Sequence, residues 1–203
     1  MRKIITTTFI TLDGVMQAPG GPEEDRHGGF KYGGWMFNYV DEIIGKTIDQ
    51  IMDLPFDLLL GKRTYDIFAS YWPSAREDLT VAKKFNSTKK YVVSKSETNL
   101  SWHNSSLITG DVVEQLKNLK KDDGNDLWVH GSGDLIQTLL AHDLIDRMLI
   151  WIFPVTIGNG KRLFGTGTKA LGLKLVDSKI SENGVIIATY EPAEPLKTGT
   201  IGG

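Results

Sequence analysis

The residues best suited to chemistry follow a short apolar run at positions 127–129. That run is followed by Gly131-Ser132-Gly133 and then by apolar residues at helical spacing, up to Leu140. The pattern predicts a buried strand, a turn of small residues and a helix. Small residues allow close approach to the backbone, and the first N–H groups of a helix have no partner within it. The order of elements therefore favours binding of an anion such as a phosphate.

The same turn also has a purely structural explanation, since glycine relieves the sharp reversal between strand and helix in many α/β proteins. Its match to the dinucleotide pattern G-x-G-x-x-G is incomplete, because Gly131 and Gly133 fill the first two positions but Ile136 occupies the third. Asp134 suits a helix N-terminus and competes with a phosphate for the same donors. Both explanations stay open on this motif alone.

Two other predicted strands end in groups that suit a phosphate. The strand 56–60 is followed by the motif Gly61-Lys62-Arg63-Thr64 at a predicted helix start, and the strand 90–94 ends at Ser94-Lys95. The carboxyl ends of parallel strands meet at one edge of a sheet, where such folds bind ligands. Cations at a helix start oppose the helix dipole, so a bound anion is a reason for their presence; the alternative is a solvated helix start.

Together the three turns predict a multiply phosphorylated ligand, and NADPH fits well. Its pyrophosphate is expected on the backbone N–H groups of residues 131–135 and 63–64. The 2′-phosphate is expected on the Arg63 guanidinium, with help from Lys62, Ser94 and Lys95.

NADPH as ligand indicates a reductase, and a reductase also needs a proton source. Asp13 follows the first predicted strand, 3–12, and Asp41 lies in the next predicted helix, 38–52. A turn-stabilising role is at least as good an explanation for Asp13. Between them, residues 15–35 are predicted to be a lid or binding loop, or alternatively a flexible insertion, with the acidic cluster 23–25 as solvated surface.

Composition narrows the classes of protein. The 203 residues are 40% hydrophobic and 24% charged, with a net charge of −2 and no cysteine. We therefore expect no nucleic-acid surface, disulfide or cysteine nucleophile, and the four histidines lack metal-ligand spacing. No run is long enough to cross a membrane and no export signal is evident, so the cytoplasm is the expected location. No Walker A or G-x-S-x-G motif supports a hydrolase.

The elements that must position these residues alternate between strand and helix. About eight strands and at least four helices predict an α/β fold, with a mostly parallel sheet that ends in an antiparallel hairpin around residues 182–184. We expect one domain over residues 1–192 and a flexible tail over 193–203.

Several motifs, in order, resemble the bacterial dihydrofolate-reductase-like proteins, which group with the C-terminal reductase domain of the bifunctional riboflavin biosynthesis enzyme RibD. They are Thr11-Leu12-Asp13-Gly14-Val15-Met16, Leu60-Gly61-Lys62-Arg63-Thr64-Tyr65, Tyr91-Val92-Val93-Ser94, Val129-His130-Gly131-Ser132-Gly133 and Pro154-Val155-x-x-Gly158-x-Gly160 with Leu163-Phe164. The resemblance implies a three-layer α/β/α dihydrofolate-reductase-like fold, an NADPH-dependent reductase and a homodimer.

The resemblance also implies nicotinamide contacts from the backbones of Phe9 and Met16, a substrate contact from Trp35, and Asp41 as the counterpart of the family's acidic residue. The turns and the resemblance together predict these cofactor-binding residues: Phe9, Met16, Gly61, Lys62, Arg63, Thr64, Ser94, Lys95, Val129, Gly131, Ser132, Gly133, Asp134 and Leu135.

Three functions remain open. The first is reduction of a small heterocycle, resembling the 5-amino-6-(5-phosphoribosylamino)uracil reductase of riboflavin biosynthesis. The second is reduction of dihydrofolate or another pterin. The third, from another class, is nucleotide binding without turnover.

Overall fold

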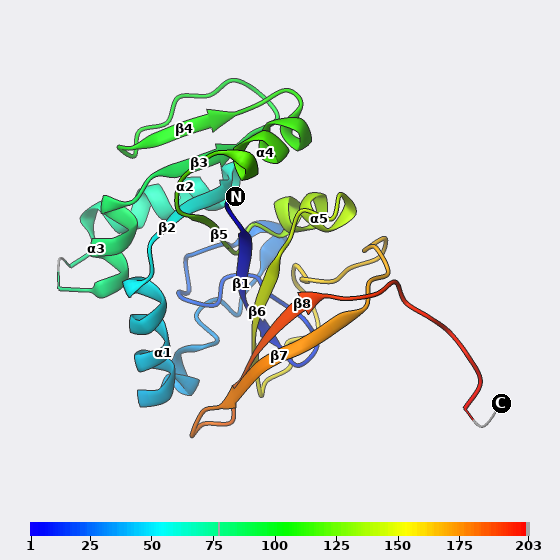
Figure 1. The fold of residues 1–203 in the computed structure, drawn as a ribbon. Helices are drawn as coiled ribbons and strands as arrows, with labels where there is room; N and C mark the ends of the chain where they lie inside the picture. Colours follow the sequence, from blue (N-terminus) through cyan, green and yellow to red (C-terminus); the bar gives the residue numbers. More distant parts are fainter. Residues whose placement is uncertain (77, 202–203) are drawn as a thin grey trace.

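The computed structural model describes residues 1–76 and 78–201. Within this part of the chain, one eight-stranded sheet has the order β4-β3-β2-β5-β1-β6-β8-β7 (Figure 1). The strands are β1 (Ile4–Thr11), β2 (Phe56–Gly61), β3 (Lys90–Val93), β4 (Ser105–Ile108), β5 (Asp126–His130), β6 (Arg147–Phe153), β7 (Leu173–Ile180) and β8 (Ile186–Pro192).

The first six strands in the order, from β4 to β6, pair in parallel, whereas β8 pairs antiparallel with both β6 and β7. β1 is buried along almost its whole length, which explains its β-branched and apolar composition. The predicted mostly parallel sheet with an antiparallel C-terminal hairpin is confirmed. The hairpin does not extend the sheet in chain order, because β8 inserts between β6 and β7.

Helices cover both faces of the sheet. They are α1 (Glu42–Asp53), α2 (Lys62–Tyr71), α3 (Thr80–Ser87), α4 (Val112–Lys121) and α5 (Gly133–Ala141), with short 3-10 helices at His27–Gly29, Phe37–Tyr39 and Trp72–Ser74. The first three α-helices pack their apolar sides on one face, and α4 and α5 pack on the other (Figure 1). The result is the predicted three-layer α/β/α arrangement.

Local capping explains where α1 begins. The helix was expected from residue 38, but the Asp41 carboxylate accepts a hydrogen bond from the Ile44 N–H at 3.0 Å and sets the first turn at Glu42. Residues 37–39 instead form a 3-10 turn. The α4 start follows the same rule, with Asp111 accepting from the Glu114 N–H at 3.0 Å.

The long connection between β1 and α1 has a small core of its own. Val15, Ala18 and Phe30 are buried together, with Trp35 and Ile157 packed against them. Val15 also forms an isolated antiparallel bridge with Arg162, in the connection after β6. The connection is therefore packed at both of its ends and joined to a second loop.

The described residues after β8 form no helix or strand through Ile201 and are exposed, and Figure 1 shows them running away from the sheet. Positions 202 and 203 of the predicted tail lie outside the described residues, and the domain boundary stays a prediction. Within the described part of the chain, no helix combines the length and apolar character needed to span a membrane.

Candidate functional site

The exits of β2 and β5 form one continuous surface. The Gly61 N–H, at the end of β2, donates a hydrogen bond to the Ser132 hydroxyl at 3.0 Å. The two strands are direct parallel neighbours, so their carboxyl ends are at the same edge of the sheet. Two of the three predicted phosphate-binding turns are thus brought together.

The backbone at the start of α5 is unusual. Gly131 has a φ of +63°, which glycine adopts readily, whereas Ser132 adopts the left-handed region with a φ of 61°. The hydrogen bond from Gly61 offsets part of the cost at Ser132. Two consecutive left-handed residues leave the first N–H groups of α5, beginning at Gly133, directed out of the turn.

Residues from two other elements border the surface formed by Gly61 and the turn at residues 131–133, which is called the rim below. A Cβ added to Gly133 would lie 3.2 Å from the Met16 sulfur, and one added to Gly131 would lie 3.9 Å from the Thr64 methyl group. The connection after β1 and the first turn of α2 therefore border the α5 turn directly. Any larger residue at position 133 would press on Met16.

The third predicted turn lies one strand farther along the same edge. Gly61 and Val93 are register partners in the parallel β2–β3 pair, so the Ser94-Lys95 turn exits beside Gly61. Ser94 is buried and its hydroxyl accepts from the Ser96 N–H at 3.3 Å, whereas the Lys95 side chain is exposed.

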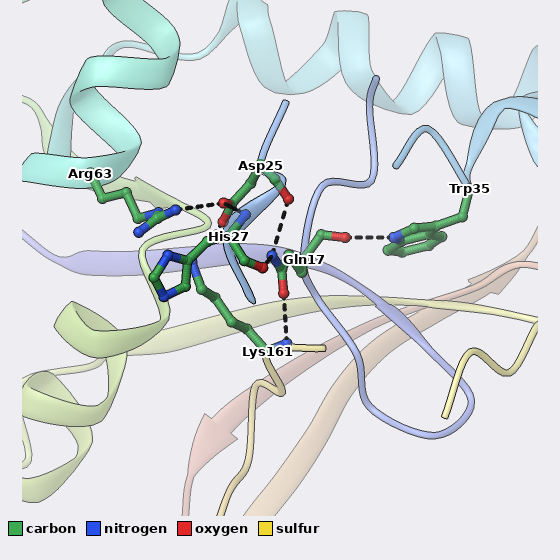
Figure 2. Close-up of polar contacts among 6 residues, drawn as sticks. All are labelled: Gln17, Asp25, His27, Trp35, Arg63 and Lys161. Carbon is green, nitrogen blue, oxygen red and sulfur yellow. Dashed lines mark hydrogen bonds and ion pairs between the residues drawn. The ribbon is translucent and has the colours of Figure 1, made fainter. Parts of the chain in front are cut away.

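Three cations at or near the rim, Lys62, Arg63 and Lys161, are paired with carboxylates of the chain. Lys62 contacts Asp66 at 2.7 Å, within α2. Arg63 contacts Asp25 at 2.7 Å, and Lys161 contacts the other oxygen of Asp25 at 2.6 Å (Figure 2). Burial raises the pKa of the Asp25 carboxyl, but hydrogen bonds from Lys161 and Arg63 outweigh it, so that pKa lies below its usual value.

The expectation that the acidic cluster 23–25 is solvated surface is wrong for Asp25, whose side chain is only 9% exposed. Lys161 was not among the predicted site residues either. Both depend on contacts between the 15–35 connection and the connection after β6. Spacing in the sequence contains no signal for such a meeting.

Asp13 has structural contacts that occupy both of its carboxylate oxygens. It accepts hydrogen bonds from the Thr11 hydroxyl at 2.6 Å, the Ile157 N–H at 3.1 Å and the Gly158 N–H at 2.7 Å, and Arg162 is 3.3 Å away. The Thr11 hydrogen bond, more than the two backbone N–H groups, lowers the pKa of Asp13 to about 2. The carboxyl group is therefore ionised and joins the β1 exit to the connection after β6.

Asp41 is likewise a structural acceptor. Besides capping α1, its carboxylate accepts from the Asn183 N–H at 2.9 Å and so connects that helix to the β7–β8 turn. Burial raises the pKa of Asp41, but backbone hydrogen bonds from Ile44 and Asn183 leave it lowered. Neither Asp13 nor Asp41 is placed as a proton donor, and we do not retain them in that role.

Phe9, a predicted nicotinamide contact, and Trp35, the predicted substrate contact, lie on the α1 face of the sheet, whereas Met16 packs on the α5 side. The Phe9 ring is 5.8 Å from Phe153, and Trp35 and Tyr39 approach the same Phe153 ring at 5.3 Å and 6.0 Å, all edge to face. The Trp35 indole N–H donates to the Gln17 carbonyl at 2.8 Å. This aromatic cluster is suited to a flat ring, because aromatic faces and edges offer favourable contacts.

His130 directly precedes the α5 turn but faces the interior. Its Nε2 is buried without a hydrogen-bond partner among the described residues, and burial lowers the pKa of His130 to about 3. The imidazole is therefore neutral at physiological pH. Within the described residues no cluster of three or more histidine and carboxylate side chains is arranged to hold a metal ion.

The sheet order and the helices on both faces define a dihydrofolate-reductase-like α/β protein. The family model of the RibD C-terminal domain matches residues 2–187, and the chain belongs to this family.

Relatives and solved structures agree with this assignment. The chain is 28% identical over 192 residues to the uncharacterized protein YyaP of Bacillus subtilis (strain 168), covering 93% of this chain and 94% of that protein. A putative riboflavin biosynthesis protein from Shewanella sp. PV-4 matches with a TM-score of 0.69 and 24% identity, covering 95% of this chain and 99% of that one.

Dihydrofolate reductase from Enterococcus faecalis, solved with NADP(H) and RAB-propyl, matches with a TM-score of 0.60 and 12% identity, covering 95% of this chain and 97% of that one. At such identities the two solved structures establish the fold. The predicted dihydrofolate-reductase-like fold is thereby confirmed, and the family model confirms the predicted family.

The contacts of Asp13 predict that Asp13→Asn lowers the free energy of unfolding at neutral pH by about 1–3 kcal/mol, since charge-assisted hydrogen bonds are lost. The Asp13 carboxyl binds a proton more weakly in the folded protein than in the unfolded chain, where the pKa of an Asp is about 3.9. The stabilisation is thus present above about pH 4 and is lost as the pH falls toward about 2. Urea denaturation across this range measures it.

A matched control is Asp49→Asn, which removes an exposed carboxylate on α1. It should change stability by less than about 0.5 kcal/mol at every pH. Equal stability of Asp13→Asn and the wild type at neutral pH would contradict the structural role of Asp13.

Proposed function

We propose that the protein is an NADPH-dependent reductase that transfers a hydride to a small heterocyclic substrate. The observation that carries this proposal is the continuous rim in which the β2 and β5 exits, Met16 and Thr64 surround the left-handed turn at the start of α5. Such a turn exposes N–H groups to an anion. Membership in the RibD C-terminal domain family supports the same conclusion.

The cofactor's pyrophosphate is proposed to bind the N–H groups of residues 133–135, with Thr64 and the first turn of α2 on its other side. Ser94 and Lys95 follow β3, which neighbours β2, and together with Lys62 at the start of α2 they are proposed to hold the 2′-phosphate. Arg63 is reassigned, because its guanidinium contacts Asp25, which Lys161 also contacts, and Lys161 follows β6, which lies on the opposite side of β2 from β3.

The nicotinamide is proposed to lie against the backbones of Phe9 and Met16, next to the aromatic cluster around Phe153. The cofactor supplies the hydride when bound. The chain binds and orients the two reactants, and the aromatic side chains exclude water from the space between them. Trp35, whose ring is fixed by its hydrogen bond to Gln17, is proposed as a substrate contact.

The substrate class proposed is a flat nitrogen heterocycle, resembling the ribosylaminopyrimidine of riboflavin biosynthesis. Family membership and the aromatic cluster support it. A pterin is the alternative on the same fold, but Asp41, the expected counterpart of an acidic substrate contact, is engaged in capping α1 and holding the β7–β8 turn. Nucleotide binding without turnover has one supporting observation, the absence of a free carboxyl group at Asp13 and Asp41.

The cofactor assignment predicts that the protein binds NADPH more tightly than NADH. Lys62→Ala should weaken NADPH binding by about tenfold or more and leave NADH binding nearly unchanged, since a charge-assisted contact to the 2′-phosphate is lost. Calorimetric titration with both nucleotides measures this. The matched control is Lys46→Ala, which breaks a similar ion pair, with Glu42, on α1.

Equal and weak binding of NADPH and NADH by the wild type would contradict the proposed cofactor. A Lys62→Ala variant that binds both nucleotides more weakly by the same factor would also contradict it.

The reductase assignment predicts consumption of NADPH in the presence of a suitable heterocycle. The measurement is the loss of NADPH absorbance with a panel of aminopyrimidine nucleotides and dihydropterins. Turnover with a pyrimidine supports the first substrate class, and turnover confined to pterins supports the alternative. Tight NADPH binding without turnover on any member would favour the non-catalytic function.

We further propose that the protein is a homodimer joined through β7. This outermost strand is exposed at every residue except Lys179, which is half-buried. Its exposed apolar side chains, with one from β8, are Leu173, Leu175, Val176, Ile180 and Ile186. A long edge strand with apolar side chains is a site for pairing with another chain, and a second copy provides it symmetrically.

This proposal predicts a dimer in sedimentation equilibrium and a shift to monomer in Leu175→Lys, which places a charge in the apolar surface. Leu196→Lys is the control, because Leu196 is exposed but lies outside β7. A monomeric wild type, or a Leu175→Lys variant as dimeric as the control, would contradict the interface.

A further inference from the structure

Two cations from separate parts of the chain meet at one carboxylate on the rim. Arg63 lies in the first turn of α2 and Lys161 in the connection after β6, and each contacts a different oxygen of Asp25, at 2.7 Å and 2.6 Å. The Asp25 side chain is 9% exposed, whereas those of Arg63 and Lys161 are 52% and 40% exposed. The carboxylate is thus enclosed by cations that remain open to solvent.

Gln17 holds the backbone that delivers this carboxylate. Its side-chain amide donates to the carbonyls of Asp25 and His27, both at 3.0 Å, and its amide oxygen accepts from the Lys161 N–H at 3.1 Å (Figure 2). Gln17 is only 4% exposed. Asp25 and Lys161 are therefore positioned against each other by one buried side chain, independently of their own ion pair.

Residues 19–29, which carry Asp25, are fixed at their ends by buried residues and within the segment by the hydrogen bonds from Gln17 to the carbonyls of Asp25 and His27. Ala18 and Phe30 are buried in the small core of this connection, and every residue between them is half-buried or exposed. Left-handed residues stand at both ends, with a φ of 49° at Ala18 and of 68° and 74° at Gly28 and Gly29. The segment is a strap whose contact with the rim at Arg63 depends on the Asp25 carboxylate.

The charges at this contact do not balance, since two cations face one carboxylate. A phosphate or diphosphate group carries more negative charge and more acceptor oxygens than a carboxylate, and it suits the fork of an Arg guanidinium. The exposed parts of Arg63 and Lys161 allow such a group to approach from solvent. It would compete with Asp25 for the same donors.

We propose that Asp25 is an internal anion that occupies a two-cation phosphate site formed by Arg63 and Lys161, and that a phosphate group of the ligand displaces the carboxylate and so breaks the link between residues 19–29 and α2. The inference rests on the proposed function, because that function brings a phosphorylated ligand to this rim. The phosphate belongs to the cofactor's pyrophosphate or to a phosphorylated substrate. In the absence of ligand, the Asp25 carboxylate occupies donors of both cations.

A protein that must break an internal contact before it binds shows a weakened apparent affinity. Asp25→Asn keeps the shape of the side chain but removes its charge, so it should raise the affinity for inorganic pyrophosphate by about fivefold or more, because the internal contact to the two cations is weaker. It should also increase hydrogen exchange at the His27 N–H, which donates to the Asp25 carboxylate at 3.1 Å, in the absence of ligand. Pyrophosphate should produce the same increase in the wild type.

The matched control is Asp143→Asn, which removes one carboxylate of the exposed Lys169–Asp143 pair. Asp143 has a φ of 53°, a conformation that asparagine tolerates. It lies just beyond the C-terminal end of α5, whereas the rim borders the N-terminal end. The control changes net charge equally, so an equal affinity gain in both variants would reduce the effect to general electrostatics and overturn the proposal.

A weaker affinity in Asp25→Asn would also overturn it, since Asp25 would then act as a brace that orients the cations. Titration with NADP⁺ and with ribose 5-phosphate distinguishes the two sources of phosphate. A higher affinity of Asp25→Asn for either ligand supports displacement of the carboxylate and identifies the phosphate that competes with it.

The two proposals fail separately. If Asp25→Asn binds pyrophosphate more tightly but no variant consumes NADPH, the displacement of Asp25 is supported and the reductase function is contradicted. If the wild type consumes NADPH but Asp25→Asn binds pyrophosphate no more tightly, the reductase function is supported and the displacement of Asp25 is contradicted.

Discussion

Parallel pairing of β2, β5 and β1 is the constraint on which the site depends. In a parallel sheet each strand must return through a crossover, so all carboxyl ends meet at one edge and all helix starts lie beside them. The hydrogen bond from the Gly61 N–H to the Ser132 hydroxyl joins two of these exits. It also stabilises a left-handed serine that would otherwise be unfavourable. The geometry of the α5 turn is therefore a property of two strands and cannot be attributed to one loop.

Carboxylates organise the edge around that turn by accepting hydrogen bonds. Asp13 joins the β1 exit to the connection after β6, and Asp41 joins α1 to the β7–β8 turn. Asp25 joins α2 to the connection after β6 through two cations. All three have lowered pKa values because donors surround the charged form. The proposed ligand is anionic, and Asp25 occupies the cations Arg63 and Lys161 that such a ligand needs. Asp25 therefore competes with the ligand, whereas Asp13 and Asp41 do not.

The two faces of the edge divide the proposed chemistry. The rim from Ser94 to Gly133 offers backbone N–H groups, hydroxyls and cations, which suit phosphates. The α1 face next to Phe9 offers aromatic rings around Phe153, which suit flat heterocycles. Met16 lies at the boundary, next to Gly133, where a nicotinamide would have to pass from one to the other. This division agrees with an extended ligand that has a charged and a planar end.

The sequence by itself determined the elements and the phosphate-suited turns. Apolar periodicity and glycine turns place β1, β2, β5 and the helix that follows each of the last two, because burial and turn conformation depend on residues close in the chain. The motifs from Thr11 to Phe164 also determined the family. Only the tertiary structure decided the roles of Asp13, Asp41 and Asp25, because a carboxylate's partners come from residues up to about a hundred and fifty positions away. A residue type specifies which hydrogen bonds and ion pairs are possible, whereas the packing of distant loops selects which of them form.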